Sequence, residues 1–68
     1  MKNFIFNWHK NEKFTAVVDR ENKIQASSAQ EAVTAFMNRF GNLKINTINF
    51  IQEVDEDGAA IGEKITTD

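Results

Sequence analysis

The sequence predicts a small α+β domain, in which one helix packs on one face of an antiparallel sheet of four to five strands. Three observations predict this fold, whose element order is β-β-(β)-α-β-β. Apolar and polar residues alternate over residues 3–9, the apolar spacing becomes helical over residues 29–40, and a β pattern returns after residue 43. The 68 residues fit one domain, which we expect to span residues 1–65, with residues 66–68 frayed.

The N-terminal part predicts a hairpin followed by a short strand. Residues 3–9 place Phe4, Phe6 and Trp8 on one side of a strand, and Ile5 between polar residues on the other. A polar turn at residues 10–12 and a second β-prone run at residues 13–19 complete the hairpin. Residues 20–22 then predict a turn, after which residues 23–26 add a short third strand.

A helix is predicted over residues 29–40. Ser28 and Glu31 have the spacing of a capping box, in which the serine accepts an amide hydrogen and the glutamate reaches back. Gly41 stands where a helix commonly ends. The apolar residues of the segment lie on one stripe of a helix: Ala29, Ala32, Val33, Phe36, Met37 and Phe40.

The C-terminal part predicts a second hairpin. Residues 43–54 form its first strand, residues 55–58 its turn, and residues 59–65 the returning strand, since Asp-Gly before apolar residues is typical of a hairpin. Strict alternation along the first strand places Ile48, Phe50 and Val54 on one face, and Ile45, Thr47 and Ile51 on the other. We expect the helix to cover the face that bears Phe4, Phe6, Trp8, Phe14 and Phe50.

The face away from the helix is the predicted protein interface. Four branched aliphatic residues are expected there among polar ones: Ile5, Val17, Ile45 and Ile51. Such residues are either a surface for a protein partner or homodimer, or isolated exposed aliphatics. We expect a small non-enzymatic interaction or regulatory protein that binds a partner, or itself, through this face.

The alternative is a nucleic-acid-binding module. The basic residues of the N-terminal hairpin, Lys10, Lys13, Arg20 and Lys23, would contact phosphates while Phe4, Phe6 and Trp8 stack on bases. An isoelectric point of about 5.3 disfavours this function, and so does the need of so small a core for the same aromatic residues.

No catalytic, cofactor-binding or metal-binding residue is predicted. His9 is the single histidine, and no nucleophile or small-molecule substrate is indicated for it. Residues 53–58 match the acidic first half of a calcium loop, but Lys64 occupies the position of its bidentate glutamate, which favours a hairpin turn. Cysteine is absent, which excludes disulfides and thiolate zinc sites.

Charge and composition complete the expectations. Residues 53–68 hold six acidic residues and one basic residue, which is typical of a solvated turn and tail or of a contact with a basic protein. No apolar run reaches the roughly 18 residues of a membrane span, and we expect a cytoplasmic protein. Lys, Asn and Ile make up 21 of the 68 residues, which indicates an AT-rich gene of a bacterium, a phage or another mobile element.

Overall fold

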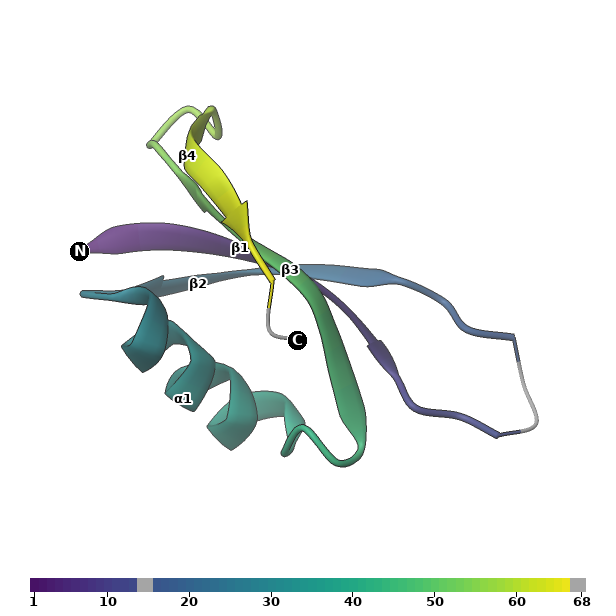
Figure 1. The fold of residues 1–68 in the computed structure, drawn as a ribbon. Helices are drawn as coiled ribbons and strands as arrows, with labels where there is room; N and C mark the ends of the chain where they lie inside the picture. Colours follow the sequence, from purple (N-terminus) through teal and green to yellow (C-terminus); the bar gives the residue numbers. More distant parts are fainter. Residues whose placement is uncertain (14–15, 67–68) are drawn as a thin grey trace.

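The computed structural model describes residues 1–13 and 16–66 and confirms the α+β fold. Its elements are β1 (Lys2–Lys10), β2 (Arg20–Ala26), α1 (Ala29–Phe40), β3 (Asn46–Val54) and β4 (Ala60–Ile65). The strands form one antiparallel sheet in the order β2-β1-β3-β4. The helix lies against one face of this sheet, and the tip of the β3–β4 hairpin rises on the other side (Figure 1).

The helix has the predicted bounds and caps. The Ser28 hydroxyl accepts the Glu31 amide hydrogen at 3.2 Å, and the Glu31 carboxylate accepts from the amide and the hydroxyl of Ser27. At the other end Gly41 has a φ of 111° and donates its amide to the Met37 carbonyl at 3.0 Å. Local capping therefore satisfies both ends of α1 independently of the sheet.

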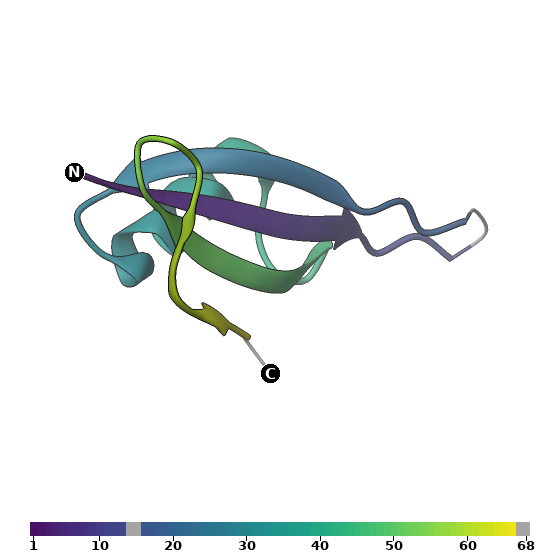
Figure 2. The ribbon, with the colours of Figure 1, turned by 90° about the horizontal axis from the view of Figure 1, so that it is seen from above.

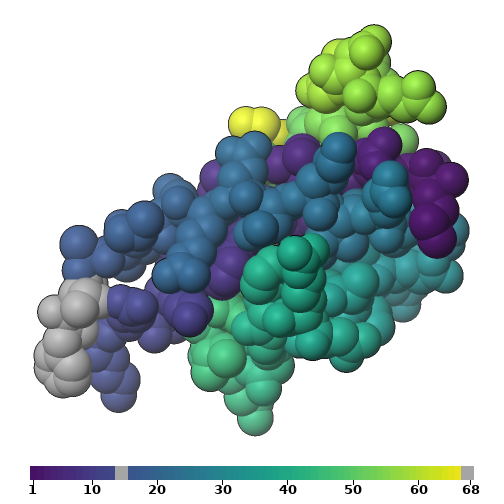
Figure 3. Space-filling view, turned by 180° about the vertical axis from the view of Figure 1, so that it is seen from behind, coloured from purple at the N-terminus to yellow at the C-terminus, as the bar shows by residue number. Residues whose placement is uncertain are grey.

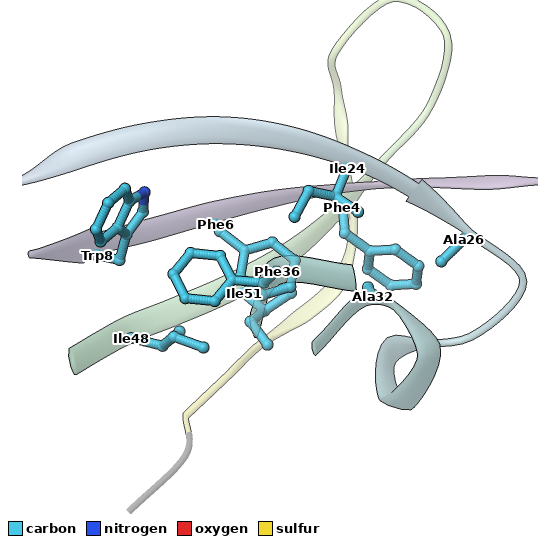
Figure 4. Packing of buried hydrophobic residues seen from close by; sticks show 9 residues of the cluster. All are labelled: Phe4, Phe6, Trp8, Ile24, Ala26, Ala32, Phe36, Ile48 and Ile51. Carbon is cyan, nitrogen blue, oxygen red and sulfur yellow. The ribbon is translucent and has the colours of Figure 1, made fainter. Parts of the chain in front are cut away.

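Phe36 of the helix joins α1 to the sheet. Its ring stacks on Phe6, with centroids 5.1 Å apart, and meets the edge of Trp8 at 5.2 Å (Figure 4). The predicted face of Phe4, Phe6 and Trp8 is thus the core face. Among the residues that the structure describes, the buried cluster consists of Phe4, Phe6, Trp8, Ile24, Ala26, Ala32, Phe36, Ile48 and Ile51.

The predicted second strand, residues 13–19, was wrong for the residues that the structure describes. Residues 11–13 and 16–19, here called the arm, belong to no strand and extend beyond the sheet (Figures 1 and 2). The strand that pairs with β1 begins at Arg20, inside the predicted turn, and includes the predicted short strand. This register sets Ile24 opposite Phe4 on the core face, and the Trp8 indole donates to Asn22 Oδ1 at 2.9 Å. Phe14, predicted for the core face, lies outside the described residues.

A β-bulge in β3 overturns the predicted assignment of its side chains to faces. Trp8 pairs with Ile48 and Asn7 with Phe50, so Asn49 is an extra residue between the two pairs. One extra residue exchanges the two faces along the remainder of the strand. Phe50, predicted to face the helix, therefore points to the opposite face, while Ile51 lies in the core and is 1% exposed.

The edge strand β4 is held partly by the buried side chain of Gln52. Ile51 pairs with Ile65, and Glu53 pairs with Ile61. The stretch of β4 between these two pairs has two more residues than the matching stretch of β3, so regular pairing is interrupted there. The Gln52 amide donates to the carbonyls of Ile61 and Gly62 at 3.1 and 3.2 Å. One side chain thus replaces main-chain pairing where the ladder is irregular.

Truncation of Phe36 tests whether its ring is the main link between helix and sheet. We expect Phe36→Ala to lower the free energy of unfolding by about 3–5 kcal/mol, the usual cost of deleting a buried aromatic ring. The matched control is Asn38→Ala, an exposed change in the same helix, with an expected effect within about 0.5 kcal/mol. Urea unfolding followed by circular dichroism measures both. A loss below about 1 kcal/mol for Phe36→Ala would contradict this role.

Replacement of Gln52 tests how β4 is attached. We expect Gln52→Leu to keep the apolar volume but to leave the carbonyls of Ile61 and Gly62 without this donor. Hydrogen exchange of the β4 amides should then accelerate more than that of the β1 amides, because β4 is an edge strand and opens locally. Equal acceleration in both strands would mean that Gln52 acts through global stability alone.

Candidate functional site

The sheet face away from α1, here called the open face, is mostly polar. It carries Asn3, Ile5, Asn7 and His9 of β1, Glu21, Lys23 and Gln25 of β2, and Thr47, Phe50, Gln52 and Val54 of β3. Several of these groups bond to one another, such as Gln25 to Asn3 Oδ1 at 3.0 Å. Phe50 is half-buried, and the Lys64 ammonium lies 4.2 Å from its ring centroid. This face therefore lacks the expected group of aliphatic residues.

The structure does not bring the four predicted interface residues together. Only Ile5 lies on the open face, where it is half-buried between polar neighbours. The placement of Ile51 was wrong because of the bulge. Val17, 58% exposed, belongs to the arm, and Ile45, 56% exposed, belongs to the loop before β3 beside Gly41.

The predicted nucleic-acid residues are also divided. Lys10 and Arg20 line a hollow of about 240 Å³ at the base of the arm, and Lys13 lies farther out. Lys23 is on the open face, whereas Arg20 is on the core face with its guanidinium 5.5 Å from the Trp8 ring centroid.

The expected stacking platform is not exposed. Phe4, Phe6 and Trp8 are each at most 2% exposed, so that part of the nucleic-acid prediction was wrong. With the aromatic faces inside the core, bases have no access to them.

His9 belongs to a polar cluster that attaches the arm to the sheet. Its Nδ1 atom lies 3.6 Å from Asp19 Oδ1, and Asn49 donates to Asp19 Oδ1 at 2.9 Å and to Asn7 Oδ1 at 2.8 Å. The hydroxyl of Thr47, the cross-strand neighbour of His9, donates to Asn11 at 2.5 Å. The contacts of this cluster thus join the arm and β1 to β3.

In the acidic turn after β3, the carboxylate of Asp55 forms hydrogen bonds within the turn itself. Asp55 Oδ1 accepts the amide hydrogens of Asp57 and Ala59, both at 2.9 Å, and Gly58 donates to the Asp55 carbonyl at 3.0 Å. The predicted hairpin turn is therefore present. Within residues 1–13 and 16–66, no group of three or more His, Asp or Glu side chains is arranged to hold a metal ion.

A groove lies between β2 and α1, beside a free strand edge. It measures about 390 Å³ and is lined by Lys23, Ile24, Gln25, Ala35 and Arg39. Within residues 1–13 and 16–66, strand β2 is at the end of the sheet and pairs with β1 alone, so its second edge borders this groove. In the space-filling view, β2 in blue and α1 in teal lie side by side (Figure 3).

The groove combines a small helical residue with two cations. The methyl group of Ala35 leaves space where a larger side chain would fill the groove. The Arg39 guanidinium lies over the Phe40 ring at 5.1 Å, and none of the described carboxylates is within ion-pair distance of Lys23 or Arg39. Sequence reasoning missed this site, because it treated residues 13–19 rather than β2 as the neighbour of β1.

Comparisons with protein-family models, with curated proteins and with solved structures found no match. Among the described residues, no helix has the length and apolar character required to cross a membrane.

Removal of the Asn49 side chain tests the attachment of the arm. We expect Asn49→Ala to increase the motion of residues 16–19, because Asp19 loses its 2.9 Å hydrogen bond to the sheet. The measurement is the ¹⁵N heteronuclear NOE of those residues, with Asn38→Ala as the control. If the NOE values of the two variants agree, the cluster does not anchor the arm.

Proposed function

We propose that this protein is a non-enzymatic binding module that recognises an extended segment of a protein partner at the free edge of β2. The partner segment would add a strand to the sheet, and its side chains would enter the groove between β2 and α1. The single observation that carries the proposal is the position of this groove along an unpaired strand edge.

The backbone of β2 supports strand addition. In an antiparallel pair, every second residue of an edge strand directs its N–H and C=O groups away from its partner. In the described part of the chain, no main-chain hydrogen bond outside the regular elements involves residues 20–26. The outward groups of β2 are therefore free to bond to an added strand, which is a recurring mode of peptide recognition.

The groove supports selection among partner segments. Side chains of an added strand alternate between the two faces of the sheet, so every second one meets the helix side. There it would contact Ile24 and Ala35, which offer apolar surface at the groove floor. Main-chain bonds then provide affinity, and the groove provides specificity.

A binding role also agrees with the contacts of the hydroxyl and imidazole side chains, which bond or lie close to other parts of the fold. The Ser28 hydroxyl caps the helix, the Thr47 hydroxyl bonds to Asn11, and His9 lies beside Asp19 in the cluster that contacts the arm. The cytoplasmic location and the bacterial, phage or mobile-element origin remain predictions from the sequence.

A groove-filling substitution tests the proposed function. A library of displayed random heptapeptides is selected on the wild-type protein, and binders are retested on Ala35→Phe and on its matched control Thr34→Phe. Ala35 lines the groove, whereas Thr34 is exposed outside its lining. We expect Ala35→Phe to weaken binding by about tenfold or more, a change of about 1.4 kcal/mol, because the ring occupies the space of a partner side chain. Thr34→Phe should bind as the wild type does.

Two results would contradict the proposed function. The first is a library that yields no binder of the wild type. The second is a set of binders whose affinity for Ala35→Phe is unchanged, with circular dichroism confirming that the variant is folded.

A further inference from the structure

We infer that the partner segment is acidic, with two successive carboxylate side chains that bind Lys23 and Arg39 from opposite sides of the added strand. This inference rests on the proposed function, because it names the chemistry of the segment that the β2 edge would take.

The charged side chains that line the groove are both positive: they are Lys23 and Arg39. Glu21 lies two residues before Lys23 on the same face of β2 but is not among the lining residues. The Glu31 carboxylate of α1 already accepts hydrogen bonds from Ser27. A segment with carboxylates would therefore meet complementary charge, whereas a basic segment would meet repulsion.

The two cations come from different sides of the sheet edge. Lys23 is opposite Ile5 and so belongs to the open face, whereas Arg39 belongs to the helix beneath the core face. Successive residues of an added strand also point to opposite faces. A pair of adjacent acidic residues would thus present one carboxylate to Lys23 and one to Arg39.

A lysine on an edge strand also discourages unwanted strand pairing. That role explains Lys23, but it does not explain Arg39, which lies on the helix and still borders the groove. The guanidinium of Arg39 is suited to a carboxylate, because its planar fork can donate two parallel hydrogen bonds.

The acidic turn of a second copy is a less suitable occupant. Its Asp55 carboxylate accepts two amide hydrogens within the turn. Residues 55–59 are also bent into a hairpin loop rather than extended, so they cannot add as a strand while the turn persists. An extended segment of a different protein fits the edge without unfolding this hairpin.

The experiment uses three labelled heptapeptides of alternating Val and Thr, with Asp-Asp, Asn-Asn or Lys-Lys at the centre. Binding to the full chain is measured by fluorescence anisotropy, and the amides of residues 20–26 are followed by NMR. We expect the Asp-Asp peptide to shift these amides and to bind at least about tenfold tighter than the Asn-Asn peptide, with an affinity that falls as salt rises.

Charge reversal provides the matched comparison. Lys23→Glu and Arg39→Glu should each weaken the Asp-Asp peptide by about threefold to tenfold, and Arg39→Glu should improve binding of the Lys-Lys peptide. Lys44→Glu, in the exposed loop before β3, has the same charge change outside the groove lining and should leave binding unaltered. All three positions are exposed, so the variants should fold.

The outcomes separate this inference from the proposed function. Equal affinity for the Asp-Asp and Asn-Asn peptides, with shifts at β2, overturns the acidic partner and keeps the edge as a binding site. If none of the three peptides shifts the NMR signals of the β2 amides, the inference of an acidic partner is overturned. The proposed function would still be supported if peptides selected from the library lose affinity for Ala35→Phe. Shifts at β2 that depend on protein concentration without peptide overturn the inference in favour of a second copy.

Discussion

The contact of Phe36 with Phe6 and Trp8 is the constraint on which the rest of the structure depends. The helix is only 12 residues long, and an isolated helix of that length is marginal in water, so α1 needs its packing against the sheet. The three rings fix the position of α1 under β1 and β2. That position creates the groove, because the row of Ala35 and Arg39 then borders the free edge of β2. The core and the proposed binding site are therefore consequences of the same contact.

Irregularities in the sheet determine which surface each side chain reaches. The bulge at Asn49 moves Phe50 to the open face and Ile51 into the core. The same residue bonds to Asn7 and Asp19, so the bulge also contributes to the attachment of the arm. In β4, the Gln52 side chain compensates for interrupted pairing. A sheet this small depends on a few polar side chains where its main-chain ladder is irregular.

The two edges of the sheet differ in what they offer a partner. At the β4 edge, all six residues of the strand are exposed. At the β2 edge, a groove lined by Ile24, Ala35 and two cations lies beside main-chain groups that point away from β1. Main-chain hydrogen bonds to an added strand could form at the β2 edge and at the β4 edge alike, so they do not distinguish the two edges. The groove and its positive charge favour the β2 edge as the binding site. This difference is the reason for proposing an interaction at the β2 edge rather than on the open face.

The sequence by itself determined the α+β class, the helix with both caps, the burial of Phe4, Phe6 and Trp8, and the acidic hairpin turn. These features depend on local spacing and capping, which act within a few residues. Only the tertiary structure decided which segment pairs with β1, where the bulge falls, and therefore the placement of Ile5, Val17, Ile45 and Ile51. The sequence offers two candidate partners for β1, residues 13–19 and residues 20–26. In the structure residues 20–26 pair with β1, and this pairing is supported by contacts of Ile24 with the core and of Asn22 with Trp8, which join residues distant in the chain.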